Sequence, residues 1–389
     1  MSFNPISMVV GALTPPPPSL TEDYDGLEYR WKVFTFRPAL FQFEIFLLAA
    51  VLLYTALYFI GRSANVRRAN KWFDAHLELY QSQFTKPHQK GGLTQDGNSD
   101  FFVFSTGRRA IKALHTTFTL RPRHDFFQLI YQTLWGFVEL DYRVNDVVEL
   151  TFTFKDSASV PDCVWAIVAK DELKGIRSKR WDLTFTKTTE NPNLPTSLTV
   201  MSEFADITEN LLKTHGPLSL STVLSNPAVL PYFRSLSLTD QPRTRPYAPV
   251  PASERGKHLI LSLNIPPSGT ATLPLVQAVF QLVDIIAGEG GWGIGKSPLT
   301  SKGPGVGLNG SLRPETRSKL KKAREELDKE LKEELAKEKR EEQAEEKAAA
   351  KRKAEEERLS RLSASEQKKA LEREKKRLMR KTQGKTKVR

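Results

Sequence analysis

Glycines and a lysine between residues 288 and 297 match two phosphate-binding patterns. Gly290 is followed, after four residues, by Gly295-Lys296-Ser297, as in G-x-x-x-x-G-K-[ST], and the same segment also satisfies G-x-G-x-x-G. Both patterns bind phosphate only when a strand precedes them and a helix begins from them. Here the preceding VQAVFQLVDIIA predicts a helix, and a proline and further glycines follow the motif. We therefore interpret the match as chance within a glycine-rich linker.

Other catalytic or metal-binding patterns are missing from the sequence. The six histidines show no paired ligand spacing, and a single cysteine, Cys163, excludes a cysteine-rich zinc site. No G-x-S-x-G nucleophile motif occurs. These observations predict a protein that is not an enzyme and binds no cofactor.

The C-terminal end carries most of the positive charge. Residues 347–389 contain 17 basic and 6 acidic side chains, in a chain of net charge +13. No aromatic residue follows Trp292, so stacking on single-stranded bases is excluded and phosphate neutralisation remains. This favours structured RNA, with an anionic lipid surface or a merely solvated helix end as alternatives. The candidate ribosomal RNA-binding residues are Lys368, Lys369, Arg373, Lys375, Lys376, Arg377, Arg380, Lys381, Lys385, Lys387 and Arg389.

The element that must position everything else is the apolar stretch ALFQFEIFLLAAVLLYTALYFI, residues 39–60. At about 1.5 Å per residue, a helix of this length crosses a hydrocarbon core of roughly 30 Å. Tyr54 and Tyr58 near one end, with Arg62 after them, are typical of a membrane–water interface. We predict one transmembrane helix at 39–61, the alternative being a buried helix of a soluble protein.

Two polar residues, Gln42 and Glu44, interrupt the start of this span. They either contact a neighbouring membrane subunit or reach the lipid headgroups. The basic residues that flank the span lean towards a lumenal N-terminus and a cytosolic C-terminus. The cysteine-poor domain and the basic tail favour the same orientation. A glycosylated Asn309, in the sequon Asn309-Gly310-Ser311, would indicate the opposite one.

The remaining chain predicts an α+β globular domain following a single N-terminal transmembrane helix, with a long charged C-terminal helix. Strand-like runs with partial alternation do not follow a regular strand–helix repeat. Predicted strands are 101–106, 115–120, 147–154, 163–169, 181–187 and 258–265, and predicted helices are 126–135, 203–214 and 274–287. The predicted parts are a flexible lumenal segment (1–38), the span (39–61), the cytosolic domain (62–287), a Gly/Pro-rich linker (288–312) and the charged helix with its basic terminus (313–389).

This layout resembles the calumin family, coiled-coil-domain-containing proteins of the endoplasmic reticulum. The resemblance lies in RRANKWFDAHLELYQSQF after the span, HLILSLNIPPSGTATLPLVQAVFQLVDII before the linker, and the ending REKKRLMRKTQGKTKVR. It implies an endoplasmic-reticulum membrane protein that partners the small membrane protein Asterix in an intramembrane chaperone complex. It also implies work beside the Sec translocon and the ribosome during insertion of multi-spanning proteins.

The sequence departs from that family at its N-terminal end. Animal members carry a long acidic lumenal segment linked to calcium binding, whereas only Glu22, Asp23, Asp25 and Glu28 precede the span here. Calcium binding is therefore not carried over. We predict a non-enzymatic subunit of the membrane-protein insertion machinery that rests in the bilayer and binds the ribosome. The alternatives are a membrane-tethered nucleotide hydrolase using Gly290–Ser297 and a calcium-handling membrane protein.

Overall fold

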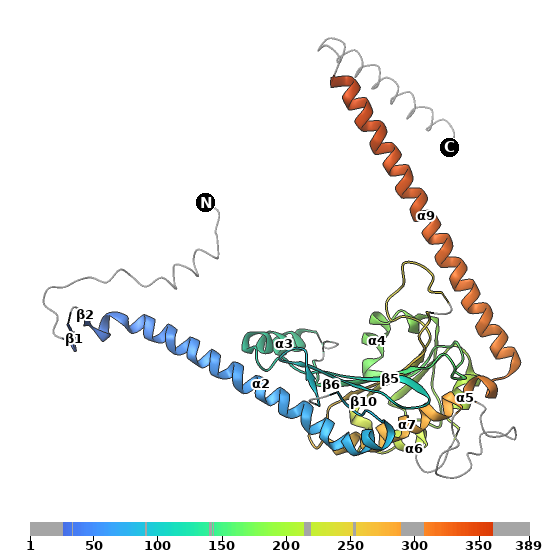
Figure 1. Cartoon of the computed structure of the whole chain (residues 1–389), viewed down its shortest axis with the longest axis horizontal. Coiled ribbons are helices and arrows are strands. Elements are labelled where there is room, and N and C mark those ends of the chain that lie inside the picture. Colours follow the sequence, from blue (N-terminus) through green and yellow to red (C-terminus); the bar gives the residue numbers. More distant parts are fainter. Residues whose placement is uncertain are drawn as a thin grey trace. The chain divides into compact units, whose positions relative to one another are not determined.

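The computed structural model describes residues 26–32, 34–89, 92–139, 142, 144–213, 219–251, 254–288 and 307–360. They fall into two compact units, one with the described residues of 1–244 and 256–317, the other with those of 245–255 and 318–360. The α-helices are α2 (Gln42–Gln83), α3 (Phe126–Val138), α4 (Leu173–Lys179), α5 (Ala205–Leu211), α6 (Leu220–Leu224), α7 (Leu273–Ala287), α8 (Leu308–Ser311) and α9 (Pro314–Ser360) (Figure 1).

The larger unit is built on a nine-stranded antiparallel sheet in the order β3-β4-β5-β6-β11-β10-β7-β9-β8. Its strands are β3 (Thr94–Gln95), β4 (Asp100–Ser105), β5 (Ile111–Thr119), β6 (Val147–Phe154), β7 (Trp165–Ala169), β8 (Lys187–Thr189), β9 (Leu198–Ser202), β10 (Phe233–Thr239) and β11 (His258–Asn264). A separate hairpin pairs β1 (Tyr29–Trp31) with β2 (Phe34–Phe36) before the span. Short 3-10 helices occur at Pro38–Phe41, Lys170–Glu172, Asp182–Phe185, Leu230–Tyr232 and Thr270–Thr272.

One face of the sheet is covered by α7 and the second half of α2 (Figure 1). Alternation in β6 directs Leu150 and Phe152 to this face, because successive side chains of a strand point to opposite sides. The ring of Phe280 in α7 meets Phe152 and Tyr80 edge-on, with centroids 5.3 and 5.9 Å apart. The second half of α2 packs into the core through one face, which carries the buried side chains of Trp72, His76 and Tyr80 at i, i+4 and i+8.

The opposite face is only partly covered. Leu173 and Ile176 of α4 pack against a cluster that includes Ala166, Val168 and Met201 of β7 and β9. Strand pairing places Ala166 in line with Ile260, Thr151 and His115 on neighbouring strands. Helix α4 does not cover the part of this row on β5 and β6, and the side chains there are only half-buried.

In its described part, the smaller unit contains the loop 245–255 and α9 from Ser318 onwards. Arg255 pairs with Asp328, and Arg245 pairs with Glu334, each at 2.6 Å. Within α9, the exposed side chains of Lys329 and Glu333 lie 3.9 Å apart at i,i+4 spacing. Over its described length α9 is one continuous polar helix, as the sequence predicted.

The α+β class and most of the longer elements were predicted correctly, but one predicted strand is wrong and several shorter elements were missed. Residues 181–187 were predicted as a strand, but Asp182–Phe185 form a 3-10 helix. The hydroxyls of Thr184 and Thr186 donate to the carbonyls of Trp181 and Leu183, at 2.6 and 2.7 Å, and such local bonds compete with strand pairing. Strands β9 and β10 were missed because serines within them, such as Ser235 and Ser237, resemble loop residues although they are buried.

Candidate membrane-proximal site

The N-terminal half of α2 presents apolar side chains that the described part of the domain leaves largely exposed. Among the described residues, two helices are long and apolar enough to cross a membrane. One ends with α7, whose side chains fill the core of the domain. The other is α2, and in its most apolar window, of mean hydropathy 2.2, no residue is buried. Of these two helices, α2 is therefore the one whose surface hydrocarbon would stabilise along a whole span.

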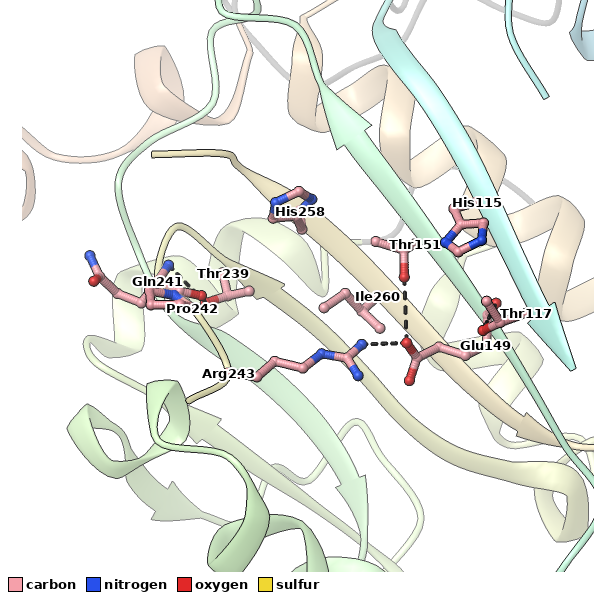
Figure 2. Close-up of a pocket in the computed structure, with 10 residues that line it drawn as sticks. All are labelled: His115, Thr117, Glu149, Thr151, Thr239, Gln241, Pro242, Arg243, His258 and Ile260. Carbon is pink, nitrogen blue, oxygen red and sulfur yellow. Dashed lines mark hydrogen bonds and ion pairs between the residues drawn. The ribbon is translucent and has the colours of Figure 1, made fainter. Parts of the chain in front are cut away.

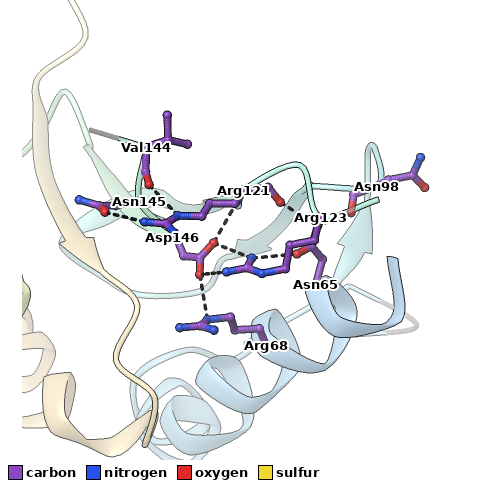
Figure 3. Close-up of polar contacts among 8 residues, drawn as sticks. All are labelled: Asn65, Arg68, Asn98, Arg121, Arg123, Val144, Asn145 and Asp146. Carbon is purple, nitrogen blue, oxygen red and sulfur yellow. Dashed lines mark hydrogen bonds and ion pairs between the residues drawn. The ribbon is translucent and has the colours of Figure 1, made fainter. Parts of the chain in front are cut away.

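Asp146 ties α2 to the sheet just beyond this apolar half (Figure 3). Arg123 donates to both carboxylate oxygens of Asp146, at 2.8 and 2.7 Å, and Arg68 of α2 lies 2.9 Å from Oδ2. The backbone N–H of Arg121 donates to Oδ1 at 3.0 Å. Burial alone would raise the pKa of Asp146, but the hydrogen bonds from Arg123 and Arg121 and the two guanidinium charges lower it. The carboxylate therefore stays ionised between its partners.

Asn65 completes this attachment from within α2 (Figure 3). Its side chain is fully buried and donates to the carbonyl oxygens of Asn98 and Arg121, at 3.0 and 3.1 Å. Its own oxygen accepts from Arg123 at 3.0 Å. One buried amide thus joins α2 to two loops, and losing it would leave several polar groups unpaired.

The segment that leads into α3 lies directly against α2. Gly61 allows this approach, since a Cβ built there would fall 1.9 Å from the carbonyl oxygen of Arg123. The rings of Tyr54 and Phe127 stack with centroids 5.6 Å apart, and Tyr58 meets His124 edge-on at 6.0 Å. Helix α3 is thereby held beside the last two turns of the apolar half of α2.

A hollow of about 410 Å³ lies on the uncovered part of the sheet (Figure 2). Glu149 and Arg243 form an ion pair in it, and Thr151 Oγ1 donates to Glu149 Oε1 at 3.5 Å. Burial lowers the pKa of His258 and His115; Arg243 lowers that of His258 further, whereas Glu149 partly restores that of His115. Neutral imidazoles, threonines and a satisfied ion pair make a polar groove without an activated nucleophile.

Comparison with known proteins supplies the identification. The family model described as PAT complex subunit CCDC47 matches residues 40–381, which is most of the chain. The chain belongs to the PAT complex subunit CCDC47 family. This is the calumin family that the sequence resembles, so that prediction is confirmed. The CCDC47 family is one of non-enzymatic membrane subunits, which also confirms that the chain is not an enzyme.

Curated relatives extend over different shares of this CCDC47-family chain. An endoplasmic reticulum membrane protein of the UPF0674 group from Schizosaccharomyces pombe is 26% identical over 361 residues, covering 87% of this chain and 86% of that protein. The human PAT complex subunit CCDC47 is 23% identical over 267 residues, and the zebrafish (Danio rerio) one is 22% identical. Each of these two vertebrate matches covers 62% of this chain. The matched part spans about half the length of those relatives. The chain is an endoplasmic-reticulum membrane protein of this family.

The residues predicted to carry function in this CCDC47-family chain lie largely outside the described part. All eleven basic residues from Lys368 to Arg389 fall there, and so does the side chain of Gln42. Glu44 is in the first turn of α2, and its Oε2 has no hydrogen-bond partner among the described residues. The roles of these residues remain predictions.

The alternative chemistries gain no support from the described residues of this family member. Residues 289–306, with the motif Gly290–Ser297, lie outside the described part, but α7 occupies the place of the strand that a phosphate loop requires. The helix ends at Gly288, whose φ of 83° closes it in a left-handed turn. No group of three metal-binding side chains occurs within the described ranges.

Sequence reasoning missed the Asp146 cluster and the exposure of α3 in this CCDC47-family fold. Asn65, Arg123 and Asp146 are separated by long stretches of sequence, and no local pattern links them. The signal for α3 was present, because FFQLIYQTLWGFV holds no charged residue. A soluble surface helix normally has a charged face.

Proposed function

We propose that the chain is a single-pass subunit of the endoplasmic-reticulum machinery that inserts and chaperones multi-spanning membrane proteins. The span is residues 39–61, with the N-terminus in the lumen and the folded domain in the cytosol. The observation that carries this proposal is the uncovered apolar half of α2, in a chain that belongs to a family of PAT complex subunits. Hydrocarbon is the surrounding that such a helix requires, because exposed apolar area of this size is unfavourable in water.

The way α2 continues into the domain fits a positioning role. A helix without a break runs from the span to Gln83, and Asp146 and Asn65 fix its second half to the sheet. The folded domain is therefore held at a set height and orientation relative to the bilayer, rather than tethered by a flexible linker. A scaffold that places a membrane partner beside a ribosome benefits from such a rigid joint.

Attachment to the ribosome is assigned to the basic terminus. The cations between Lys368 and Arg389 would neutralise phosphates of folded ribosomal RNA, with an affinity that falls steeply as salt rises. Helix α9 precedes them, and its 47 residues extend about 70 Å at the helical rise. A long polar helix of this kind supports the proposal because it presents the terminus at a distance from the start of the helix.

Partners within the membrane are assigned to the start of the span. An intramembrane carboxyl group such as that of Glu44 is costly unless it is paired. We assign it, together with Gln42, to an Asterix-like small membrane protein. The Sec translocon and its associated multipass insertion factors would then be neighbours of the assembled complex.

Purification of the tagged chain in mild detergent tests the proposal. We expect ribosomes and a small membrane protein to copurify. Deleting 359–389 should remove the ribosomes and keep the membrane partner, whereas Glu44→Leu with Gln42→Leu should remove the membrane partner and keep the ribosomes. Replacing the exposed pair Lys329 and Glu333 by glutamine is the control, because it leaves the net charge unchanged. Purification of the intact chain without either partner would contradict the proposal.

A further inference from the structure

Helix α3 turns its apolar face away from the protein. Large apolar side chains line its outer side, with Phe127 71% and Phe137 79% exposed. Its inner side is formed by Leu129, Gln132 and Gly136, which are only half-buried at i, i+3 and i+7 spacing. The exposed set is Phe126, Phe127, Ile130, Tyr131, Leu134, Trp135, Phe137 and Val138. A helix of a soluble domain shows the reverse arrangement, with its apolar stripe against the core.

Length and burial limit what α3 can be. Its 13 residues reach only about 20 Å, which is too short to cross a bilayer. None of its residues is buried, so it is not a core helix either. Apolar helices of this length that are neither core nor span lie in the membrane interface or dip into it.

The position of α3 relative to α2 is fixed by the contacts at Gly61, Tyr58 and Tyr54. Tyr54 precedes Gly61 by seven residues, which is about 10 Å along the helix. If the span leaves hydrocarbon near Gly61, then Phe127, stacked on Tyr54, lies at the depth of the upper acyl chains. This is the depth at which interfacial helices sit, about 5–10 Å below the headgroups.

We propose that α3 is a second membrane-contacting element, embedded in the interfacial layer of the leaflet on the domain side. Its apolar face contacts lipid acyl chains, and Trp135 and Tyr131 mark the headgroup level. This inference rests on the span proposed above. It adds that the domain does not merely hang from one helix but lies against the bilayer along α3.

Lipid, rather than a protein partner, is the occupant that the surface favours. The outer face of α3 continues the apolar surface of α2 and has no charged side chain that would give a protein partner specificity. Elsewhere in the described part, beyond the segment before α2, only Phe104 and Tyr247 are large exposed apolar residues. From Gln42 onwards, the large exposed apolar residues of the described part are thus concentrated on α2 and α3, as a bilayer would require.

Fluorophores attached to single added cysteines in the full chain, reconstituted in phosphatidylcholine liposomes, test this inference. The variants are Phe127→Cys and Phe137→Cys in α3, Leu52→Cys in the span, and Phe104→Cys on β4 as the water-exposed control. The unsubstituted chain is the labelling control, because its one cysteine, Cys163, is buried. All four positions are exposed, so these variants should fold, and Phe137→Cys leaves intact the ring contact with Tyr54 that Phe127→Cys removes.

A nitroxide quencher high on the lipid acyl chain should lower the fluorescence at 127 and 137 by about two-fold, as expected for shallow burial, and should leave 104 unchanged. Quenching at 52 but not at 127 or 137 would overturn the inference and keep the span. No quenching at 52 would overturn the span itself. If 127 and 137 are unquenched in liposomes but protected from labelling in native microsomes, a protein covers α3, and the lipid inference is wrong.

Discussion

Replacing Gly61 by alanine tests whether the close approach of α3 to α2 determines how the domain meets the bilayer. The added Cβ would lie 1.9 Å from the carbonyl oxygen and 2.3 Å from the carbonyl carbon of Arg123, and 2.6 Å from the backbone nitrogen of His124. These are backbone atoms that cannot rotate away as a side chain could. The segment 121–125 must therefore move, and the hydrogen bonds of Asn65 and Arg123 move with it.

The expected cost follows from two opposing effects. Forcing an extra methyl into a packed contact costs about 1–3 kcal/mol, and contact with backbone places this case at the upper end. In the opposite direction, alanine has a higher helix propensity than glycine, which stabilises the helix by about 1 kcal/mol. The net loss is about 2 kcal/mol, which lowers the melting temperature by about 4–8 °C for a domain of this size.

Gly175 provides the matched control, because it also lies within a helix, α4, and a Cβ there meets nothing within 4 Å. Gly175→Ala should leave the melting temperature unchanged or raise it slightly. The assay is thermal unfolding of the full chain in mild detergent, with amide hydrogen exchange over residues 121–139. We expect faster exchange there in Gly61→Ala only. If both variants unfold alike and exchange alike, the contact does not hold α3, and the argument fails.

Three further predictions follow from the site and the tail. Burial lowers the pKa of His76 to about 4, although hydrogen bonds to Trp72 and Thr272 oppose this shift. The unfolded chain therefore binds the proton more tightly than the folded one, so the free energy of unfolding should fall by about 3 kcal/mol between about pH 6.5 and about pH 4. Urea titrations at several pH values would measure this loss, and His76→Gln should remove it. Asp146→Asn leaves Arg68 and Arg123 without their counter-charge and should lower the free energy of unfolding by about 2 kcal/mol. The loss is limited to this size because the partly exposed arginines retain some water. Urea unfolding at pH 7 would measure it, and a loss no larger than that of an exposed ion pair would argue against the cluster. Deleting 359–389 should abolish co-sedimentation with ribosomes in moderate salt, and unchanged co-sedimentation would show that the tail does not bind the ribosome. For the intact chain, the affinity for ribosomes should fall by about 10³-fold or more between low and moderate salt if six or more phosphates are contacted.

The sequence predicted the elements whose patterns are local. Alternation in 147–154 defined β6 to the residue, and the apolar periodicity of 274–287 gave α7 within one residue. The strand predicted at 181–187 failed because threonine hydroxyls there bond to nearby carbonyls and close tight turns.

The candidate site was harder to predict because its contacts join distant segments. Nothing local indicates that Asn65 meets Arg123 or that Asp146 receives two arginines. The outward apolar face of α3 was also not predictable from periodicity, since a core helix and an interfacial helix share the same spacing and differ only in what covers them. The sequence does not indicate why residue 61 is glycine. The reason is that the loop around Arg123 approaches α2 so closely that a side chain at this position would not fit.

Protease treatment of sealed microsomes that contain the chain, tagged at its C-terminus, tests the central claim most directly. The account places the folded domain and the basic terminus in the cytosol. It therefore predicts that the tag is lost, and that only a short fragment with the span and the lumenal segment is protected. Survival of the C-terminal two-thirds of the chain until detergent is added would place the domain in the lumen, where it cannot meet a ribosome, and would contradict the account.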